Sequence, residues 1–225
     1  MFKIEPHSHT DESSNCGKIP GAELAERYHE IGYDGIAITD HLYEGMLKKL
    51  DDPNDWDACV DFFLRGYKAA KARGDEIGIS VILGAEIRFK GCPNDYLVYG
   101  IDEKFLRDNP FLFRTDPWSF YKKFGGELVI IHAHPFRGGN EAVYTDCIHG
   151  IEAVNLNPRH PSRNELAIAL SEAHPELLVF YGSDTHQIQD IGCAWMLFNK
   201  EIHNSEEFRR AVLARDYALG KVDQP

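Results

Sequence analysis

The sequence predicts an α/β fold in which strands and helices alternate to form one small barrel, and three observations support this prediction. Short apolar runs alternate with amphipathic stretches along almost all of the 225 residues, a pattern typical of parallel strand–helix units. The chain has no internal repeat, low-complexity run or linker, so we expect a single domain over residues 1–225. Candidate metal ligands recur directly after the strands, where a barrel collects its active-site residues.

The strands are expected where several apolar or β-branched residues run together. The first ends at Pro6, and the others recur between the helices. They comprise residues 2–5, 35–39, 79–83, 96–101, 128–131, 150–154, 177–181 and 195–198. The mixed acidic and basic segment 43–55 is expected to be irregular, either a lid or a simple connection.

The helices are expected where apolar residues recur at spacings of three and four. They comprise residues 21–31, 56–72, 118–124, 162–173 and 205–214. Ser162 and Ser205 are the expected N-caps of the last two helices, because a serine hydroxyl accepts a hydrogen bond from a free N–H of the first turn.

The charge of the chain limits its partners. There are 36 acidic and 24 basic residues, which gives a formal net charge of −12. Nucleic-acid backbones are bound by cationic surfaces, so long nucleic acids are disfavoured as partners. A small anion can still bind to such a chain if metal ions supply positive charge at the site.

The cysteines and the amino terminus indicate the compartment. The five cysteines are odd in number and widely spaced, which favours free thiols in a reducing environment over a disulfide framework. The first residues carry no signal-peptide pattern, and no apolar run approaches the ~20 residues of a membrane span. We therefore expect a cytoplasmic protein without a membrane partner.

Five short segments carry side chains that bind metals, and each follows or borders an expected strand. They contain His7 and His9, Asp40 and His41, Glu86 and Asp95, His132 and His134, and Asp184 and His186. Imidazoles and carboxylates without cysteine disfavour a structural zinc site and suit Zn²⁺, Mn²⁺ or Fe²⁺. Because carboxylates can bridge ions, the cluster predicts two or three divalent ions at one centre.

These segments resemble, in the same order, the motif series of the PHP (polymerase and histidinol phosphatase) family. The resemblance covers about residues 4–190 and is carried by His7-Ser8-His9, Thr39-Asp40-His41, Gly84-Ala85-Glu86, Ala133-His134-Pro135 and Gly182-Ser183-Asp184-Thr185-His186. It implies a distorted (β/α)7 barrel with the metal site at the C-terminal ends of the strands. It also implies a stand-alone metal-dependent phosphoesterase.

The resemblance also implies which residues hold each ion. His7, His9, Glu86 and Asp184 would hold the first ion, Glu86 would bridge to a second ion also held by His134, and His41 and His186 would hold a third. Two positions depart from the family pattern. Asn15 stands where the family usually has Asp or His, and is either an uncharged ligand of a weaker third site or a turn residue. Asp95 stands where His is common, and is either a ligand that favours Mn²⁺ or Fe²⁺ or a solvated carboxylate.

Other residues have less specific expectations. Asp40 either orients a ligating imidazole or caps the end of a strand. His132 is a further ligand, a partner that orients one, or a buried hydrogen-bonded histidine. Arg137 is the first candidate to clamp a phosphate, because its planar guanidinium matches phosphate oxygens. Further candidates, with solvated charge as the alternative, are Arg159, Arg163 and Arg88.

The predicted reaction is hydrolysis of a small-molecule phosphoester, as in a histidinol phosphatase, by a hydroxide that bridges two metal ions. Metal binding lowers the pKa of water from ~15.7 to as low as ~7, which makes this nucleophile accessible. Glu86, Asp184 and His186 are the expected catalytic residues, and the acid for the leaving group is Asp184, His186 or a metal-bound water. The alternatives are amidohydrolase-type cleavage of a C–N or C–O bond and a non-catalytic metal-binding module. Arginines directed at the metals would favour the phosphoesterase.

Overall fold

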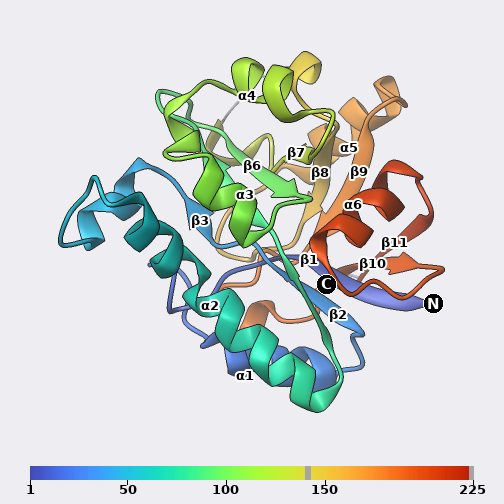
Figure 1. Cartoon of the computed structure of the whole chain (residues 1–225). Helices are drawn as coiled ribbons and strands as arrows, with labels where there is room; N and C mark the ends of the chain where they lie inside the picture. The colour runs from blue at the N-terminus through green and yellow to red at the C-terminus, as the bar shows by residue number, and fades with distance from the viewer. Residues whose placement is uncertain (140–142, 223–225) are drawn as a thin grey trace.

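The computed structural model describes residues 1–139 and 143–222, which form a mixed α/β fold with two sheets (Figure 1). In the described residues the first sheet has five strands in the order β11-β10-β1-β2-β4. Their bounds are β1 (Phe2–Ser8), β2 (Gly35–Ile38), β4 (Ser80–Leu83), β10 (Ala194–Phe198) and β11 (Tyr217–Lys221). Strands β1, β2 and β4 are parallel, whereas β10 runs antiparallel to both β1 and β11.

The second sheet, over the same described ranges, has six strands in the order β3-β5-β6-β7-β8-β9. Their bounds are β3 (His41–Leu42), β5 (Ala85–Arg88), β6 (Asp95–Tyr99), β7 (Val129–His132), β8 (Gly150–Asn155) and β9 (Leu178–Gly182). Strand β6 runs antiparallel to both of its neighbours, so the expectation of only parallel strand–helix units was wrong. The connection from β5 to β6 is too short for the dozen or so residues of a parallel crossover.

The two sheets meet along the strands that carry the metal-ligand motifs. Strand β4 continues into β5 through Gly84, where a Cβ would lie 2.8 Å from the Thr39 side chain. On the other side, an isolated parallel bridge joins Ser8 to Thr185, just beyond β9. The expected α/β class is confirmed, and in the described residues the strands form two joined sheets, without a closed ring of strand pairing.

The helices cover the outside of the sheets. They are α1 (Gly21–Glu30), α2 (Trp56–Ile77), α3 (Glu103–Asp108), α4 (Pro117–Phe124), α5 (Asn164–Ala173) and α6 (Ser205–Leu213), with short 3-10 turns η1 (Glu44–Lys49), η2 (Leu112–Arg114), η3 (Arg137–Gly139), η4 (Thr145–Cys147) and η5 (Ile188–Asp190). Helices α1 and α2 pack side by side against the first sheet (Figure 1). Among the described helices, none combines the length and the apolar character needed to cross a membrane.

Both predicted serine caps were wrong, and each serine has another partner. Asn204 caps α6 through a 2.9 Å bond from the Glu207 N–H, while the Ser205 hydroxyl accepts the Gly100 N–H. Helix α5 begins at Asn164 after Arg163 in a left-handed conformation. The hydroxyl of Ser162 is bonded to Asn155 instead, which ties the start of α5 to the end of β8.

Candidate metal centre

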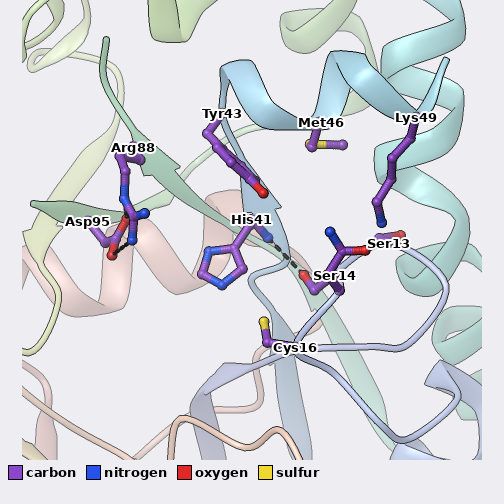
Figure 2. Close-up of a pocket in the computed structure, with 10 residues that line it drawn as sticks. Ser13, Ser14, Cys16, His41, Tyr43, Met46, Lys49, Arg88 and Asp95 are labelled. Atoms are coloured by element: carbon purple, nitrogen blue, oxygen red, sulfur yellow. Dashed lines mark hydrogen bonds and ion pairs between the residues drawn. The ribbon is translucent and has the colours of Figure 1, made fainter. Parts of the chain in front are cut away.

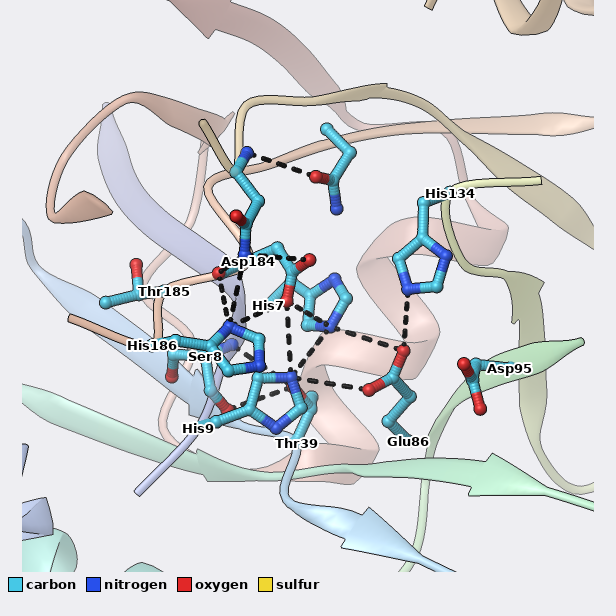
Figure 3. Close-up of polar contacts among 12 residues, drawn as sticks. His7, Ser8, His9, Thr39, Glu86, Asp95, His134, Asp184, Thr185 and His186 are labelled. Atoms are coloured by element: carbon cyan, nitrogen blue, oxygen red, sulfur yellow. Dashed lines mark hydrogen bonds and ion pairs between the residues drawn. The ribbon is translucent and has the colours of Figure 1, made fainter. Parts of the chain in front are cut away.

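Side chains of the predicted segments meet in one buried cluster at the ends of the strands, where Figure 3 shows His7, Glu86 and Asp184. His41, from the second segment, lies beside Glu86. His7 and His9 lie at and just after the end of β1, His41 begins β3, and Glu86 lies on β5. His134 follows β7, and Asp184 and His186 follow β9. All seven are fully or almost fully buried except His41, whose side chain is 23% exposed at the edge of the cluster.

Backbone contacts bring the first and last motifs together, although they lie at opposite ends of the sequence. The His9 N–H donates to the Thr185 carbonyl at 2.9 Å, and the Thr185 N–H donates to the His7 carbonyl at 3.1 Å. His134 and Asp184 both have positive φ angles, 32° and 52°. Residues other than glycine rarely adopt this conformation, and such strain often occurs at functional sites.

Two carboxylate oxygens at the middle of the cluster have no hydrogen-bond partner in the described residues: Glu86 Oε2 and Asp184 Oδ1. His9 Nε2 lies 3.3 Å from the Glu86 oxygen and 3.4 Å from the Asp184 oxygen. Two ligand atoms that each lie about 2.1 Å from one ion in tetrahedral geometry are about 3.4 Å apart. Buried polar atoms are normally paired, so these spacings fit ligands arranged for a metal ion.

His7 and His134 complete the arrangement around these carboxylates. His7 Nε2 lies 3.3 Å from Asp184 Oδ1, and His134 Nε2 lies 3.0 Å from Glu86 Oε1. The other oxygen of Glu86, Oε2, lies 2.9 Å from His41 Nδ1, although the two atoms do not have hydrogen-bond geometry. The two oxygens of Glu86 therefore contact different histidines. This is the arrangement that a carboxylate bridging two ions requires.

The electrostatics favour ionised carboxylates in the metal-free protein. Burial raises the pKa of Glu86, but the charges of His41 and His7 outweigh burial and hold that pKa well below its usual value. Burial likewise raises the pKa of Asp184, but the charges of His7 and Arg137 outweigh burial and hold that pKa well below its usual value. Burial and the nearby His186 and His41 lower the pKa of His9, so its ring is neutral and able to bind a metal.

Two buried glutamates support the cluster, and neither was among the predicted site residues. Glu152 on β8 accepts a 2.8 Å contact from His7 Nδ1 and a 3.0 Å bond from the His134 backbone N–H. It thus fixes the tautomer of His7 and leaves Nε2 directed at the cluster. Glu5 on β1 accepts the backbone N–H groups of His7 and Ser183, and burial raises its pKa to about 7. An acidic residue inside each otherwise buried strand was the available signal.

Asp40 holds a loop, whereas we expected it to orient an imidazole or cap a strand. Its carboxylate accepts the N–H and hydroxyl of Thr10, at 2.8 and 2.6 Å, and the hydroxyl of Ser14 at 2.7 Å. The Ser14 hydroxyl in turn accepts the His41 backbone N–H at 3.0 Å. Asp40 therefore fixes the loop after His9 against the strand end that carries His41.

This loop places Cys16, and not only Asn15, beside the predicted third site. Asn15 is exposed and lines a cavity of about 160 Å³ together with Cys16 and His41. The Cys16 sulfur forms one group with ligand atoms of His9, His41 and His186, all within 4.8 Å of one another. Burial raises the pKa of the Cys16 thiol, but the adjacent His186 and His41 lower it more, to about 6.

Asp95 is nearly buried and lies near His41 and Glu86, as predicted for a ligand. Both of its oxygens, however, accept bonds from Arg88, at 2.7 and 2.5 Å, so a metal at Asp95 competes with this pair (Figure 2). His132 is buried against the Tyr96 ring, and its Nδ1 has no partner in the described residues. Burial and His134 lower the pKa of His132 to about 3.

The three candidate arginines other than Arg88 take different positions. Arg137 points into the centre, where its Nη2 lies 2.7 Å from Asp184 Oδ2 and 2.6 Å from Asn155 Oδ1. Its Nε is buried without a partner among the described residues. Arg159 is bonded to Asp190 through both terminal nitrogens, at 2.7 Å each. Arg163 lies with its guanidinium 6.0 Å from the Phe136 ring.

Two cavities flank the cluster. The one lined by Cys16 and His41 also has Lys49 and Arg88 in its wall, as Figure 2 shows. The other, of about 400 Å³, shares Asp95 in its wall with the first and is lined by His132, His134 and Arg137 among others. Both cavities combine metal-ligand side chains with arginine or lysine, which suits a small anionic ligand.

A model of the PHP domain family matches residues 5–190 of the chain. No protein with a curated description matches the sequence. Several solved structures share the fold at low sequence identity. One is a two-domain protein from Bacteroides vulgatus that contains a predicted PHP-like metal-dependent phosphoesterase, with a TM-score of 0.69 and 18% identity. The match covers 98% of this chain and 64% of that protein, so the chain spans less than two thirds of its length.

Two further structures match over nearly their whole length. A predicted metal-dependent phosphoesterase from Bifidobacterium adolescentis has a TM-score of 0.57 and 16% identity, over 98% of this chain and 96% of that one. An amidohydrolase from Chromobacterium violaceum, with bound sulfate and no metal, has a TM-score of 0.56 and 15% identity over 97% of both chains. At these identities the likeness shows a shared fold.

Proposed function

Because the chain belongs to the PHP domain family, we propose that it is a metal-dependent phosphoesterase that hydrolyses a small-molecule phosphoester. The observation that carries this proposal is the pair of unpartnered carboxylate oxygens on Glu86 and Asp184, set among histidine nitrogens at ligand spacing. A buried polar network that completes its own hydrogen bonds does not leave such atoms. Divalent cations of the kind that the family uses would complete them.

We assign the side chains to two or three ions. His7, His9, Glu86 and Asp184 would hold the first ion, Glu86 and His134 would hold the second, and His41 and His186 would hold the third. When bound, these ions make a nucleophile from water at neutral pH and neutralise the charge of phosphate oxygens. The identity of the ions follows from the ligands: imidazole and carboxylate suit Zn²⁺, Mn²⁺ and Fe²⁺.

Arg137 supports phosphate rather than an uncharged substrate. Its Nη2 anchors it to Asp184 and Asn155, and this leaves the buried Nε–H free for an acceptor. A guanidinium fixed in this way offers a preorganised donor to a non-bridging phosphate oxygen. Asp184 contacts Arg137, and His186 lies 3.3 Å from Asp184, so the proton for the leaving group would come from Asp184, from His186 or from a metal-bound water.

The substrate is small because the centre is reached through small cavities, one of about 160 Å³ and one of about 400 Å³. The net charge of −12 also disfavours a long polyanion. Arg88 and Lys49 line the smaller cavity, so an anionic group of the substrate can be bound on that side as well.

The test is hydrolysis of a panel of small phosphomonoesters, histidinol phosphate and p-nitrophenyl phosphate included, by protein reconstituted with Zn²⁺, Mn²⁺ or Fe²⁺. An N-acyl amino acid and a lactone serve as substrates for the amidohydrolase reaction. We expect phosphate release that is lost with a chelator and restored by metal. Turnover of the amide or lactone without phosphate release would contradict the proposal.

A further inference from the structure

We propose that the thiolate of Cys16 is a metal ligand, which makes the outer part of the centre a sulfur- and nitrogen-containing site selective for Zn²⁺. The Cys16 sulfur shares a 4.8 Å neighbourhood with ligand atoms of His9, His41 and His186. Figure 2 shows the sulfur directed towards the His41 ring at the wall of the cavity. This inference rests on the proposed metal centre, because Cys16 can be a ligand only if that centre binds metal.

The loop that carries Cys16 is fixed to both of the strand ends that carry its histidine partners. Ser14 accepts the backbone N–H of His41, and the Lys18 N–H donates to the His186 carbonyl at 2.8 Å. Between them, Gly17 packs so closely on Thr10 that a Cβ would lie 2.3 Å from the Thr10 carbonyl oxygen. Cys16 is therefore held in place before any ion binds, as a preorganised ligand must be.

The histidine partners are oriented for binding. Nδ1 of His186 lies 2.8 Å from the Asp184 carbonyl oxygen, which can only accept a hydrogen bond. Nδ1 therefore carries the proton, and Nε2 is left as the metal-binding nitrogen. The ring of His9 lies against both His186 and His41, with centroids 4.3 and 4.5 Å away, and its buried Nδ1 has no partner in the described residues.

A cysteine at this position changes the chemistry of the site. Asn15 offers only a neutral oxygen, whereas a thiolate supplies a negative charge when its proton is released on metal binding. Thiolate together with imidazole favours Zn²⁺ over Mn²⁺, and carboxylate favours the harder ion. The inner ligands Glu86 and Asp184 and the outer ligand Cys16 thus have different preferences within one centre.

The experiment uses the full chain loaded with Co²⁺, whose thiolate complexes absorb in the near ultraviolet. We expect this charge-transfer absorption in the wild type and in Cys193→Ser, a control at a similarly half-buried cysteine, and its loss in Cys16→Ser. In Cys16→Ser the affinity for Zn²⁺ should also fall. Removing a residue that only supports a metal ligand lowers the affinity about 10- to 100-fold, and loss of the ligand itself should lower it at least as much. Cys16→Asp should also lack the absorption, but it should bind Mn²⁺ at the outer site more tightly than Cys16→Ser does.

A second measurement covers the case in which the Cys16 variants do not fold. Iodoacetamide labelling of the wild-type protein, followed by mass spectrometry of its peptides, should show that Zn²⁺ protects Cys16 and leaves the labelling of Cys193 unchanged. The inference about Cys16 is overturned if Co²⁺ binds without the absorption, or if Cys16 is labelled equally with and without Zn²⁺. The proposed function stands in that case as long as turnover is lost with a chelator. A wild-type chain that binds no metal at all overturns both.

Discussion

The two ends of the second sheet both contain buried or half-buried ionisable groups, but only one end leaves them without partners. At the start of β8, His149 accepts the Ile130 N–H on Nδ1 at 3.1 Å, and its Nε2 donates to the Gly125 carbonyl at 3.0 Å. At the opposite end, Glu86 and Asp184 each retain a buried oxygen that accepts no hydrogen bond within the described residues.

This difference distinguishes a structural polar cluster from a binding site. His149 is complete within the fold, so its loss should affect stability alone. The metal centre is complete only in its supporting groups, such as Glu152, which accepts bonds from His7, His134 and Asn155. Function should therefore be confined to the end of the sheet that carries the unpartnered carboxylates.

The largest effect is expected at the bridging carboxylate. Glu86→Gln keeps the shape of the side chain but removes the charge that can hold two ions. Turnover should fall on the order of 10²–10³-fold or more, as when one group that stabilises developing charge is removed. The steady-state rate of phosphate release and the metal content of the same sample measure it, with the exposed Glu176→Gln as control. Unchanged turnover would remove Glu86 from the centre.

Arg137→Lys should give the next largest effect, because lysine cannot bond Asp184 and Asn155 and also present a second donor. A charge-assisted hydrogen bond contributes about 1.5–3 kcal/mol, so kcat/KM should fall about 10- to 150-fold. Arg73→Lys is the matched control, since Arg73 bridges α2 to Glu26 of α1 on the surface. Equal rates for the two variants would count against a phosphate contact at Arg137.

Glu152→Gln tests a group that acts through His7. It keeps a hydrogen-bond acceptor but removes the carboxylate, and metal affinity should fall about 10- to 100-fold. Competition with a chromophoric chelator measures the affinity, and saturating metal should restore most of the turnover. Restoration distinguishes a positioning role from a direct one: a variant that stays inactive at full metal occupancy would contradict it.

Much of this centre could be predicted from the sequence, because its ligands form short motifs at strand ends. The strand before Asp184 was found from its apolar run, and the first strand was found only as residues 2–5, whereas β1 continues through Pro6 to Ser8 and so includes His7. Glu152 was missed because it lies within an apolar run, where periodicity indicates only a buried strand. Cys16 was missed because its proposed ligand role depends on a loop conformation set by Asp40 and Gly17, which no local pattern reveals.

The fold class was predicted as α/β, but the arrangement of the strands was not. Residues 85–88 follow β4 after the single residue Gly84, so β5 was not recognised as a separate strand. The antiparallel pairing of β5 with β6 was therefore not predicted either. Strand direction is decided by the length of a connection and by long-range pairing. Strand β11 was also missed, because its five residues show only a weak apolar pattern and its pairing with β10 spans the helix α6.

The smallest effect is expected at the complete end of the sheet. Burial and Arg209 lower the pKa of His149, and its bond with the Gly125 carbonyl only partly offsets them. In the pH range below about 6.5 the unfolded chain therefore binds more protons at this residue than the folded chain does. The contribution of neutral His149 to stability is fully present above about pH 6.5, the pKa of histidine in the unfolded chain. It is lost as the pH falls towards and through the lower pKa that His149 has in the folded chain.

His149→Gln should make the free energy of unfolding less dependent on pH between about 5 and 6.5, without changing turnover at neutral pH. Urea denaturation at several pH values measures this, with the exposed His29→Gln as the control. A variant that keeps the wild-type pH slope, or that loses activity while remaining folded, would break the distinction between the two ends.

The most direct test of the metal centre is elemental analysis of freshly purified protein together with phosphomonoester turnover on the same sample, before and after chelation. The account predicts two or three divalent ions per chain and turnover that disappears with the ions and returns with them. A chain that binds no metal even after reconstitution, or whose phosphatase activity is unaffected by removing it, would contradict the account.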